Sequence, residues 1–418
     1  FIDALFCRSI RMIAAHQIRK DDHHMIHFAS TSFSPSEMQA LLDFRRKLHQ
    51  HPELSEQEQK TTAQIRAALF SLGLEELDLG LPTGVAAILR GKQHDAAVLL
   101  RADIDALPVE ESTEWAYSSQ IPGTMHACGH DVHATALLGA AALLRQHKND
   151  LPGDVLFLFQ PAEETMVGAE KVIAAGLLQR FPIRAVFGMH VWPQLESGTV
   201  GLHAGPVTAA KDVFQIMLQG DGGHSSSPHL THDSIVCGAE LILALQSIVS
   251  RNLNPFDPAV LSVCSVHAGS CDNVIPDQMS LLGSVRTFSA EGRKLIRKRI
   301  EELSKAIAAA HECRAEISFV PGLPSAVNSA QLMSTARLAV EATYSENGIV
   351  ECGSVSFSED FSLYGDIAPT FFYLFGVHES GTERYPLHSP FFCPSDQASA
   401  SAAALLANSA TIFLENEI

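Results

Sequence analysis

The apolar positions of this chain fall into two patterns, short continuous runs and longer stretches with helical spacing. Four continuous runs predict buried strands: 84–89, 96–103, 154–159 and 184–190. Between them, helical spacing predicts helices near 131–147 and 166–178. Buried strands that alternate with helices indicate an α/β fold, a mainly parallel sheet with helices on both faces.

The pattern changes near residue 209, where a second domain is predicted. Strands are expected at 212–218, 259–267, 277–288 and 314–320, with helices near 231–251 and 291–311. This β-α-β-β-α-β order is typical of a ferredoxin-like α+β domain. We therefore expect one domain in two parts, 33–208 and 322–418, with a second domain, 209–321, inserted between them. Residues 1–24 lack periodicity and are expected to be a disordered extension, with Met25 a candidate natural start.

Polar residues stand where the predicted strands of the first domain end. Asp103 closes one strand, Glu163 and Glu164 follow another, and His190 closes a third. In open α/β sheets, ligands bind at the carboxyl ends of the strands. Residues far apart in the sequence are therefore expected to converge at this edge.

The segment 124–133 carries three histidines, one cysteine and one aspartate immediately before an alanine-rich helix. Divalent ions such as Zn²⁺ bind sulfur, imidazole nitrogen and carboxylate oxygen together. The combination predicts a metallohydrolase. A buried free thiol at Cys128 beside a helix-capping histidine is the structural alternative.

Composition narrows the possible partners. The 47 acidic and 29 basic residues give a net charge of −18, which argues against nucleic acid and anionic membranes as partners. No apolar run reaches the roughly 18 residues of a membrane span. Eight scattered cysteines, most of them in apolar stretches, favour a reducing cytoplasm over secretion.

Nine motifs, in their order along the chain, resemble the M20 family of metallopeptidases in its amidohydrolase branch. That branch contains hippurate hydrolases, N-acyl-amino-acid amidohydrolases and hydrolases of auxin (IAA) conjugates. The motifs lie at 100–108, 125–131, 160–164, 188–190, 222–224, 273–276, 286–288, 358–361 and 387–390. They span most of the chain from about residue 35 to 415. The family resemblance implies that the domain in two parts, 33–208 and 322–418, is the catalytic domain and that the inserted one, 209–321, is a lid and dimerisation domain.

The resemblance implies a set of ligands for one or two divalent ions, Mn²⁺ or Zn²⁺ first, with Co²⁺ or Ni²⁺ as alternatives. The implied ligands are Cys128 as a bridging thiolate, His130, Glu164, His190 and His388. His378 competes with His388, because a loop position carries no geometric support. His126 and His133 are weaker candidates, and His133 is more easily read as a packing residue.

Further roles come from the same resemblance. Glu163 is implied as the general base, and His224 as an oxyanion or carboxylate contact that reaches across a homodimer. Asn273 and Arg286 are implied as substrate-binding residues, and a planar guanidinium suits a carboxylate. Asp103 is a candidate to orient a ligating imidazole from behind, although capping of the following turn explains it nearly as well.

The predicted function is metal-dependent hydrolysis of the amide bond of N-acyl or aryl-acyl amino acids. A dipeptidase or carboxypeptidase with the same site is the alternative within enzymes. An alternative outside enzymes is a catalytically silent protein that binds acyl amino acids. A third alternative is a thiol hydrolase with Cys128 as nucleophile and His130 as base. The apolar residues Met166, Trp192 and Phe361 are expected near the cleft.

Overall fold

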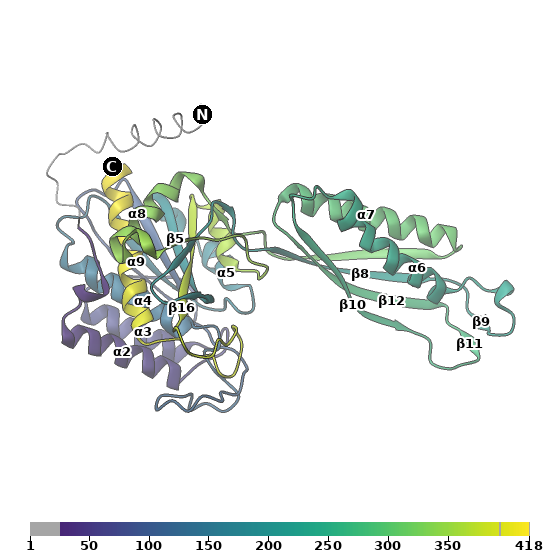
Figure 1. Ribbon diagram of the computed structural model, residues 1–418, viewed down its shortest axis with the longest axis horizontal. Helices are drawn as coiled ribbons and strands as arrows, with labels where there is room; N and C mark the ends of the chain where they lie inside the picture. The colour runs from purple at the N-terminus through teal and green to yellow at the C-terminus, as the bar shows by residue number, and fades with distance from the viewer. Residues whose placement is uncertain (1–25, 393, 418) are drawn as a thin grey trace.

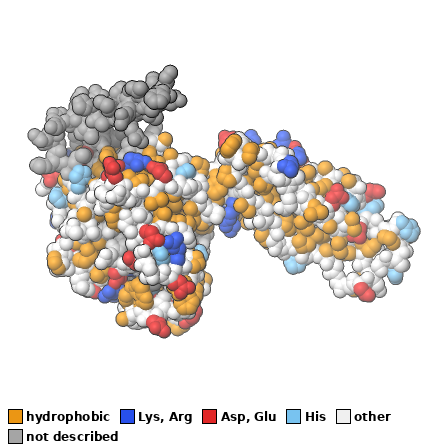
Figure 2. Space-filling model, in the orientation of Figure 1, with side chains coloured by type: hydrophobic (Ala, Val, Ile, Leu, Met, Phe, Trp, Pro, Cys, Tyr) orange, Lys and Arg blue, Asp and Glu red, His pale blue; other side chains and the backbone are white. Residues whose placement is uncertain are grey.

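The computed structural model describes residues 26–392 and 394–417, and the proposed extension 1–24 lies outside them. The chain forms two lobes joined by a narrow neck (Figures 1 and 2). The larger lobe is built on an eight-stranded sheet with the order β1-β2-β4-β3-β5-β16-β6-β15. Its strands are β1 (Glu75–Leu77), β2 (Val85–Leu89), β3 (Ala97–Asp103), β4 (Asp154–Gln160), β5 (Ile183–Glu196), β6 (Val200–Leu202), β15 (Ile349–Glu351) and β16 (Thr370–His378).

The sheet is mainly parallel, as predicted. β4, β3, β5 and β16 run parallel through its centre, and β15 runs parallel to β6. The antiparallel pairs are β1 with β2, β2 with β4, and β6 with β16. The parallel centre is apolar at nearly every position because helices cover both of its faces.

Helices cover the two faces unequally. One face packs against α2 (Pro35–Gln50), α3 (Gln59–Ser71), α4 (His130–Gln146), α8 (Met333–Tyr344) and α9 (Gln397–Glu417). The other face packs against α5 (Gly168–Ala174) and the 3₁₀ segment Asp360–Asp366. The predicted α/β class with helices on both faces is therefore confirmed. The alanines of α4 and α9 let these two helices approach closely beside the sheet.

The smaller lobe is a four-stranded antiparallel sheet with the order β10-β12-β8-β13. Its elements are β8 (Ala210–Gln219), α6 (Ser234–Ser247), β10 (Ala259–Ala268), β12 (Gln278–Thr287), α7 (Ala290–Ala310) and β13 (Arg314–Pro321). In β8, Phe214, Ile216 and Leu218 face the two helices, and the alternate residues are more exposed. The connectivity and strand order are those of the ferredoxin-like fold. We call this lobe the lid.

Two short strand pairs mark the ends of the lid. β7 (Gly205–Pro206) pairs with β14 (Val327–Asn328) at the neck. β9 (Gly223–His224) pairs with β11 (Val274–Ile275) at the opposite tip (Figure 1). The glycine-rich stretch before His224 thus ends in a short antiparallel strand pair.

One helical stretch of the described residues, Ser234–Asn252, is long and apolar enough to cross a membrane by length and composition. It comprises α6 and a π-helical turn, Ile248–Asn252. Its buried side chains, including Cys237, Leu241 and Leu245, pack on the lid sheet. The exposed remainder includes Val236 and Leu243.

Candidate metal centre

The turn that ends at Gly129 brings Cys128 and His130 to the edge of the sheet. Gly129 has a φ of +83°, and a Cβ at this position would lie 2.5 Å from Val191 Cγ2. Only glycine fits both the left-handed backbone and the close approach to β5. His130 is the first residue of α4, so its side chain and that of Cys128 are fixed by the start of a buried helix.

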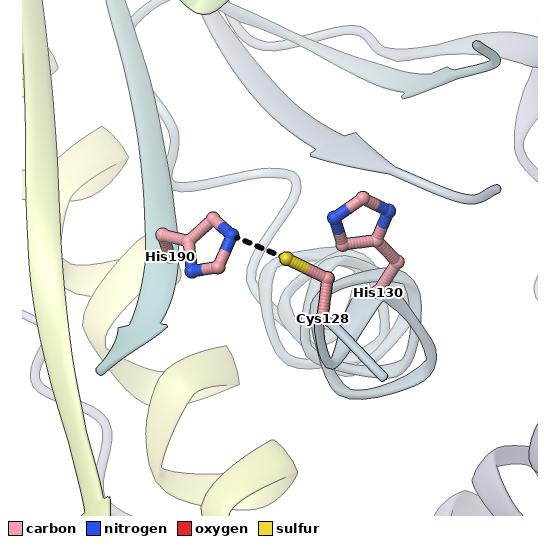
Figure 3. A group of neighbouring side chains, drawn as sticks. All are labelled: Cys128, His130 and His190. Atoms are coloured by element: carbon pink, nitrogen blue, oxygen red, sulfur yellow. Dashed lines mark hydrogen bonds between the residues drawn. The ribbon is translucent and has the colours of Figure 1, made fainter. Parts of the chain in front are cut away.

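The thiol of Cys128 lies between two imidazoles from distant parts of the chain. Its Sγ atom is 3.4 Å from Nε2 of His190 on β5 and 3.2 Å from Nε2 of His388 in the loop after β16. Figure 3 shows Cys128, His130 and His190 converging on one space from the α4 turn and β5. This thiol is therefore the centre of the cluster.

The tautomers of two imidazoles suit metal binding. Nδ1 of His130 lies 3.2 Å from Asp105 Oδ1, and Nδ1 of His190 lies 2.8 Å from the carbonyl oxygen of Val191. Both acceptors require N–H at Nδ1, so each Nε2 faces the cluster and offers it a lone pair when the ring is neutral. Nε2 of His130 has no hydrogen-bond partner among the described residues.

Glu164 completes the cluster from the turn after β4. Its Oε1 atom lies 3.8 Å from His130 Nε2 and 3.6 Å from His388 Nε2, and it is buried without a hydrogen-bond partner in the described part of the chain. A buried carboxylate oxygen without a hydrogen-bond partner, close to two imidazole nitrogens, is a position that a metal cation would stabilise. The donor set therefore fits one or two divalent ions.

The electrostatics of the cluster also call for a cation. Burial alone would lower the pKa of His130, but Asp103, Asp105 and Glu164 raise it to about 10. Burial and Asp105 raise the pKa of Glu164 to about 7 even though His130 lowers it. The site attracts positive charge strongly, and a divalent ion would supply it.

Cys128 is a poor nucleophile in this setting. Burial, and then the carboxylates of Glu164 and Glu163, hold the pKa of its thiol well above the ordinary range. A thiolate forms here only beside a compensating cation. This disfavours the thiol-hydrolase alternative and favours Cys128 as a metal ligand.

Glu163 faces the same space from a buried position. It lies with His130 and Glu164 in one group of donor atoms and with Glu359 and Asp360 in another. Burial, Glu359 and Asp360 raise its pKa well above the ordinary range. A carboxylate with a raised pKa accepts a proton readily, which is what a general base requires.

A buried guanidinium partly balances this negative charge. Arg101 is fully buried and donates to Asp103 at 2.7 Å, to Glu359 at 3.0 Å and to Asp360 at 2.7 Å. Bidentate and branched contacts of this kind are a property of arginine that lysine lacks. Arg101 therefore fixes the carboxylates that lie behind Glu163.

The turn that carries Glu163 has a strained backbone. Ala162 has a φ of +57°, a conformation that costs a residue other than glycine about 1–3 kcal/mol. Its N–H donates to Oε1 of the buried Glu58 at 2.8 Å. Burial raises the pKa of Glu58 to about 7, and a hydrogen bond of the ordinary kind stabilises by about 0.5–1.5 kcal/mol, so this contact offsets part of the strain.

The structure assigns the imidazole-orienting role differently from the sequence. Asp103 Oδ1 lies 2.5 Å from Nδ1 of His133 and 3.8 Å from His130 Nε2. The carboxylate that holds His130 is Asp105, two residues further on. His133 Nε2 accepts the Val191 N–H at 3.0 Å, so His133 is a packing residue, as expected. His126 lies outside these clusters, and burial lowers its pKa to about 4.

The remaining predicted ligand positions are also resolved by geometry. His388 lies in the cluster, whereas its competitor His378 ends β16 with Nε2 3.8 Å from Glu196. His190 does not end its strand, since β5 continues to Glu196 beside β16. The last residue of β5 that pairs with β3 is Gly188, which lies opposite Arg101. His190 comes two residues later, beyond this pairing, and its side chain therefore faces the site.

A cleft of about 690 Å³ opens from the cluster toward the lid. It is lined by Met166, Trp192 and Phe357, and by the cations Lys211 and Arg286. The prediction that Phe361 lines it is wrong, because that ring is fully buried against Gly188, whose missing side chain makes room for it.

The lid residues separate into two groups. Arg286 reaches the cleft, where Nη1 donates to the carbonyl oxygen of Ser356 at 2.7 Å and lies 3.2 Å from Ser358 Oγ. His224 and Asn273 lie together at the far tip of the lid, where the Ser225 N–H donates to the Asn273 carbonyl. Within one chain the fold does not bring these two to the cleft.

Sequence reasoning missed Asp105, Glu359, Lys211 and Glu58. Asp105 had a visible signal, because it stands two residues after Asp103 in the same motif, 100–108, at the end of a predicted strand. Lys211 reaches the cleft as the register partner of Arg286, and this pairing is visible only in the structure. Glu58 gave no signal, because its contact spans 104 positions.

The fold and the cluster define the chain as a metallohydrolase. It belongs to peptidase family M20/M25/M40, whose profile matches residues 99–410. It is 41% identical over 381 residues to an N-acetylcysteine deacetylase of Bacillus subtilis. This alignment covers 90% of this chain and 97% of that protein. It is 35% identical over 388 residues to an IAA-amino acid hydrolase of Arabidopsis thaliana, covering 92% and 87%.

A solved structure agrees with these relatives. The crystal structure of a dinuclear metal-binding peptidase of the M20 family from Bacillus subtilis matches with a TM-score of 0.81 and 38% identity, covering 90% of this chain and 98% of that one. The predicted family and enzyme class are confirmed. The chain is a metal-dependent amidohydrolase that uses a divalent ion.

Proposed function

We propose that this enzyme hydrolyses the amide bond of N-acyl or aryl-acyl amino acids, hippurate-like substrates included, and releases a carboxylic acid and a free amino acid. The observation that carries the proposal is one cleft that joins a Cys-His-Glu metal cluster to two cations. Neither Lys211 nor Arg286 has an ion-pair partner among the described residues. Two unpaired cations in an acidic protein suit the carboxylate of an acyl amino acid.

The ligands proposed for the metal are Cys128, His130, Glu164, His190 and His388. When bound, a divalent ion lowers the pKa of water and polarises the substrate carbonyl. Mn²⁺ or Zn²⁺ suits the mixed donors best, and Co²⁺ or Ni²⁺ would also fit. Asp105 holds the His130 ring in the tautomer that binds.

Glu163 performs the proton transfers in this mechanism. Its carboxylate takes a proton from the attacking water and returns it to the leaving amine. Burial and the acids behind it, Glu359 and Asp360, raise its pKa, which favours the carboxyl as the carrier of the transferred proton. Arg286, already anchored by Ser356 and Ser358, holds the substrate carboxylate. Met166, Trp192 and Phe357 give the acyl group an apolar wall.

The proposal extends to a cytoplasmic homodimer that forms through the lid. Apolar side chains are visible over the lid surface in Figure 2, and Ile235, Val236 and Leu243 of α6 are among the exposed ones. β10 is an edge strand of the lid sheet. An isologous contact through these elements would cover both features. His224, remote from its own cleft, would then reach the cleft of the second copy and stabilise the oxyanion.

A substrate screen tests the proposal. N-acetyl, N-benzoyl and indole-acetyl amino acids are incubated with the enzyme in Mn²⁺, Co²⁺ or Zn²⁺, and release of the free amino acid is measured. The same screen includes dipeptides. Faster turnover of dipeptides than of every acyl amino acid would favour the dipeptidase alternative.

A further inference from the structure

Glu58, the residue that precedes α3, contacts the turn that carries the proposed base. We propose that Glu58 is a positioning residue for Glu163 and acts through the left-handed backbone of Ala162. The inference rests on the proposed function in that Glu163 is taken as the proton-transferring group. It assigns a role to a residue that touches neither substrate nor any proposed ligand side chain.

The side chain of Glu58 is held in a buried position by a hydrogen bond from the Ala162 backbone. The residue is fully buried, and its Oε1 atom accepts the Ala162 N–H at 2.8 Å. Its Oε2 atom has no hydrogen-bond partner among the described residues. A buried carboxyl with one oxygen unpartnered is unfavourable. Burial raises the pKa of this carboxyl to about 7, although the Ala162 N–H and the Thr83 side chain lower it.

Hydrogen bonds and a close backbone contact also hold this turn at other points. The Gly168 N–H donates to the Ala162 carbonyl at 3.0 Å, and the Met166 N–H donates to the Glu163 carbonyl at 2.6 Å. A Cβ at Gly168 would lie 1.8 Å from the carbonyl oxygen of Pro161, so the two ends of the turn are in tight contact. Ala162 directly precedes Glu163, so a rotation at Ala162 would move Glu163 out of its position.

Two other carboxylates hold the same turn, and they differ from Glu58 in one respect. Asp105 accepts the Glu164 N–H and Asp360 accepts the Ala169 N–H, both at 2.9 Å. Both of these belong to the charged groups around the metal cluster and Glu163. Glu58 holds the turn through the Ala162 N–H, and it also lies close enough to Asp105 for that carboxylate to raise its pKa.

The test is a rescue experiment on the full-length, metal-loaded enzyme. Glu58→Ala should lower kcat about 10–100-fold with little change in KM, because a small misplacement of a catalytic group costs up to about 10²-fold. Metal content, measured by elemental analysis, should stay at the wild-type value. Glycine adopts the left-handed conformation without strain. The double variant Glu58→Ala/Ala162→Gly should therefore recover to within about threefold of wild type.

Matched controls separate this role from a general loss of structure. Ala162→Gly alone should keep near wild-type kcat, and so should Glu56→Ala, which removes an exposed carboxylate from the same segment. Glu58→Gln keeps an acceptor oxygen and should retain kcat within about threefold. If Glu58→Ala does not fold, a large kcat loss in folded Glu58→Gln overturns the proposal.

Two further outcomes would also overturn it. One is wild-type turnover in Glu58→Ala. The other is a folded, metal-replete Glu58→Ala whose loss is not reduced by Ala162→Gly. Absence of hydrolysis by the wild-type enzyme in the substrate screen would instead contradict the proposed function, so the two failures are distinguishable.

Discussion

At the scale of single residues, the proposed chemistry depends on a carboxylate with a raised pKa beside a metal cluster. Glu163→Gln keeps the shape of the side chain but can neither accept nor return a proton. We expect kcat to fall about 10²–10⁴-fold, with metal content unchanged. Steady-state kinetics and elemental analysis on the same samples check this. A loss of less than tenfold would remove Glu163 from the role of base.

Cys128 tests the metal cluster itself. A serine hydroxyl stays protonated where a thiolate would bind, so Cys128→Ser should bind less metal than wild type. Cys237→Ser, a buried cysteine of the lid, is the matched control. Full metal occupancy in Cys128→Ser after dialysis would contradict the assignment of Cys128 as a ligand.

Sequence reasoning was most informative where residue chemistry is local. Cys128 and His130 flank one glycine, and Glu163 and Glu164 are adjacent, so their proximity was visible in the chain. Asp105 was missed in favour of Asp103 because the choice depends on which carboxylate the imidazole of His130 meets. The packing of α4 on β3 determines which carboxylate contacts His130, and this packing cannot be predicted from the spacing of residues in the sequence.

At the scale of elements, α2 and α4 are joined by a buried charged cluster. Arg45 and His49 of α2 both contact Asp131 of α4, at 3.1 Å and 3.0 Å, and His49 also lies 3.3 Å from Glu111. Although burial lowers the pKa of His49, Asp131 and Glu111 raise it to about 9. The charged form of His49 therefore stabilises the folded state.

The sign of the pH dependence follows from this raised pKa. The contribution is complete below the unfolded pKa of about 6.5 and is lost as pH rises through about 9. Its size is about 3 kcal/mol in the free energy of unfolding. Urea unfolding at pH 6 and pH 9.5 should show a larger decrease for wild type than for His49→Gln. An equal decrease in both proteins would refute the prediction.

The positions of the strands were predicted correctly where apolar runs were long, but the direction and register in which the strands pair were not. Each predicted strand of the lid lies within two residues of an observed one. The antiparallel placement of β2 could not be predicted, because an apolar strand reads the same in either direction. The continuation of β5 past His190 was missed for a similar reason, since its support is the register with β16.

At the scale of the whole molecule, the distance of His224 from its own cleft makes the dimer testable. His224→Ala and Glu163→Gln should each be nearly inactive alone. After subunit exchange, a mixed dimer holds one site with both residues intact, so activity should return. Absence of recovery, with exchange shown by differently tagged subunits, would mean that His224 does not act across a dimer.

The central claim is that hydrolysis requires a divalent ion held by the cluster and a proton carried by Glu163. The most direct measurement is amino-acid release by wild type and Glu163→Gln after chelation and again after addition of Mn²⁺ or Zn²⁺, with bound metal counted in each sample. We predict that both proteins regain metal but only wild type regains activity. Full activity in chelated wild type, or equal recovery in Glu163→Gln, would contradict the account.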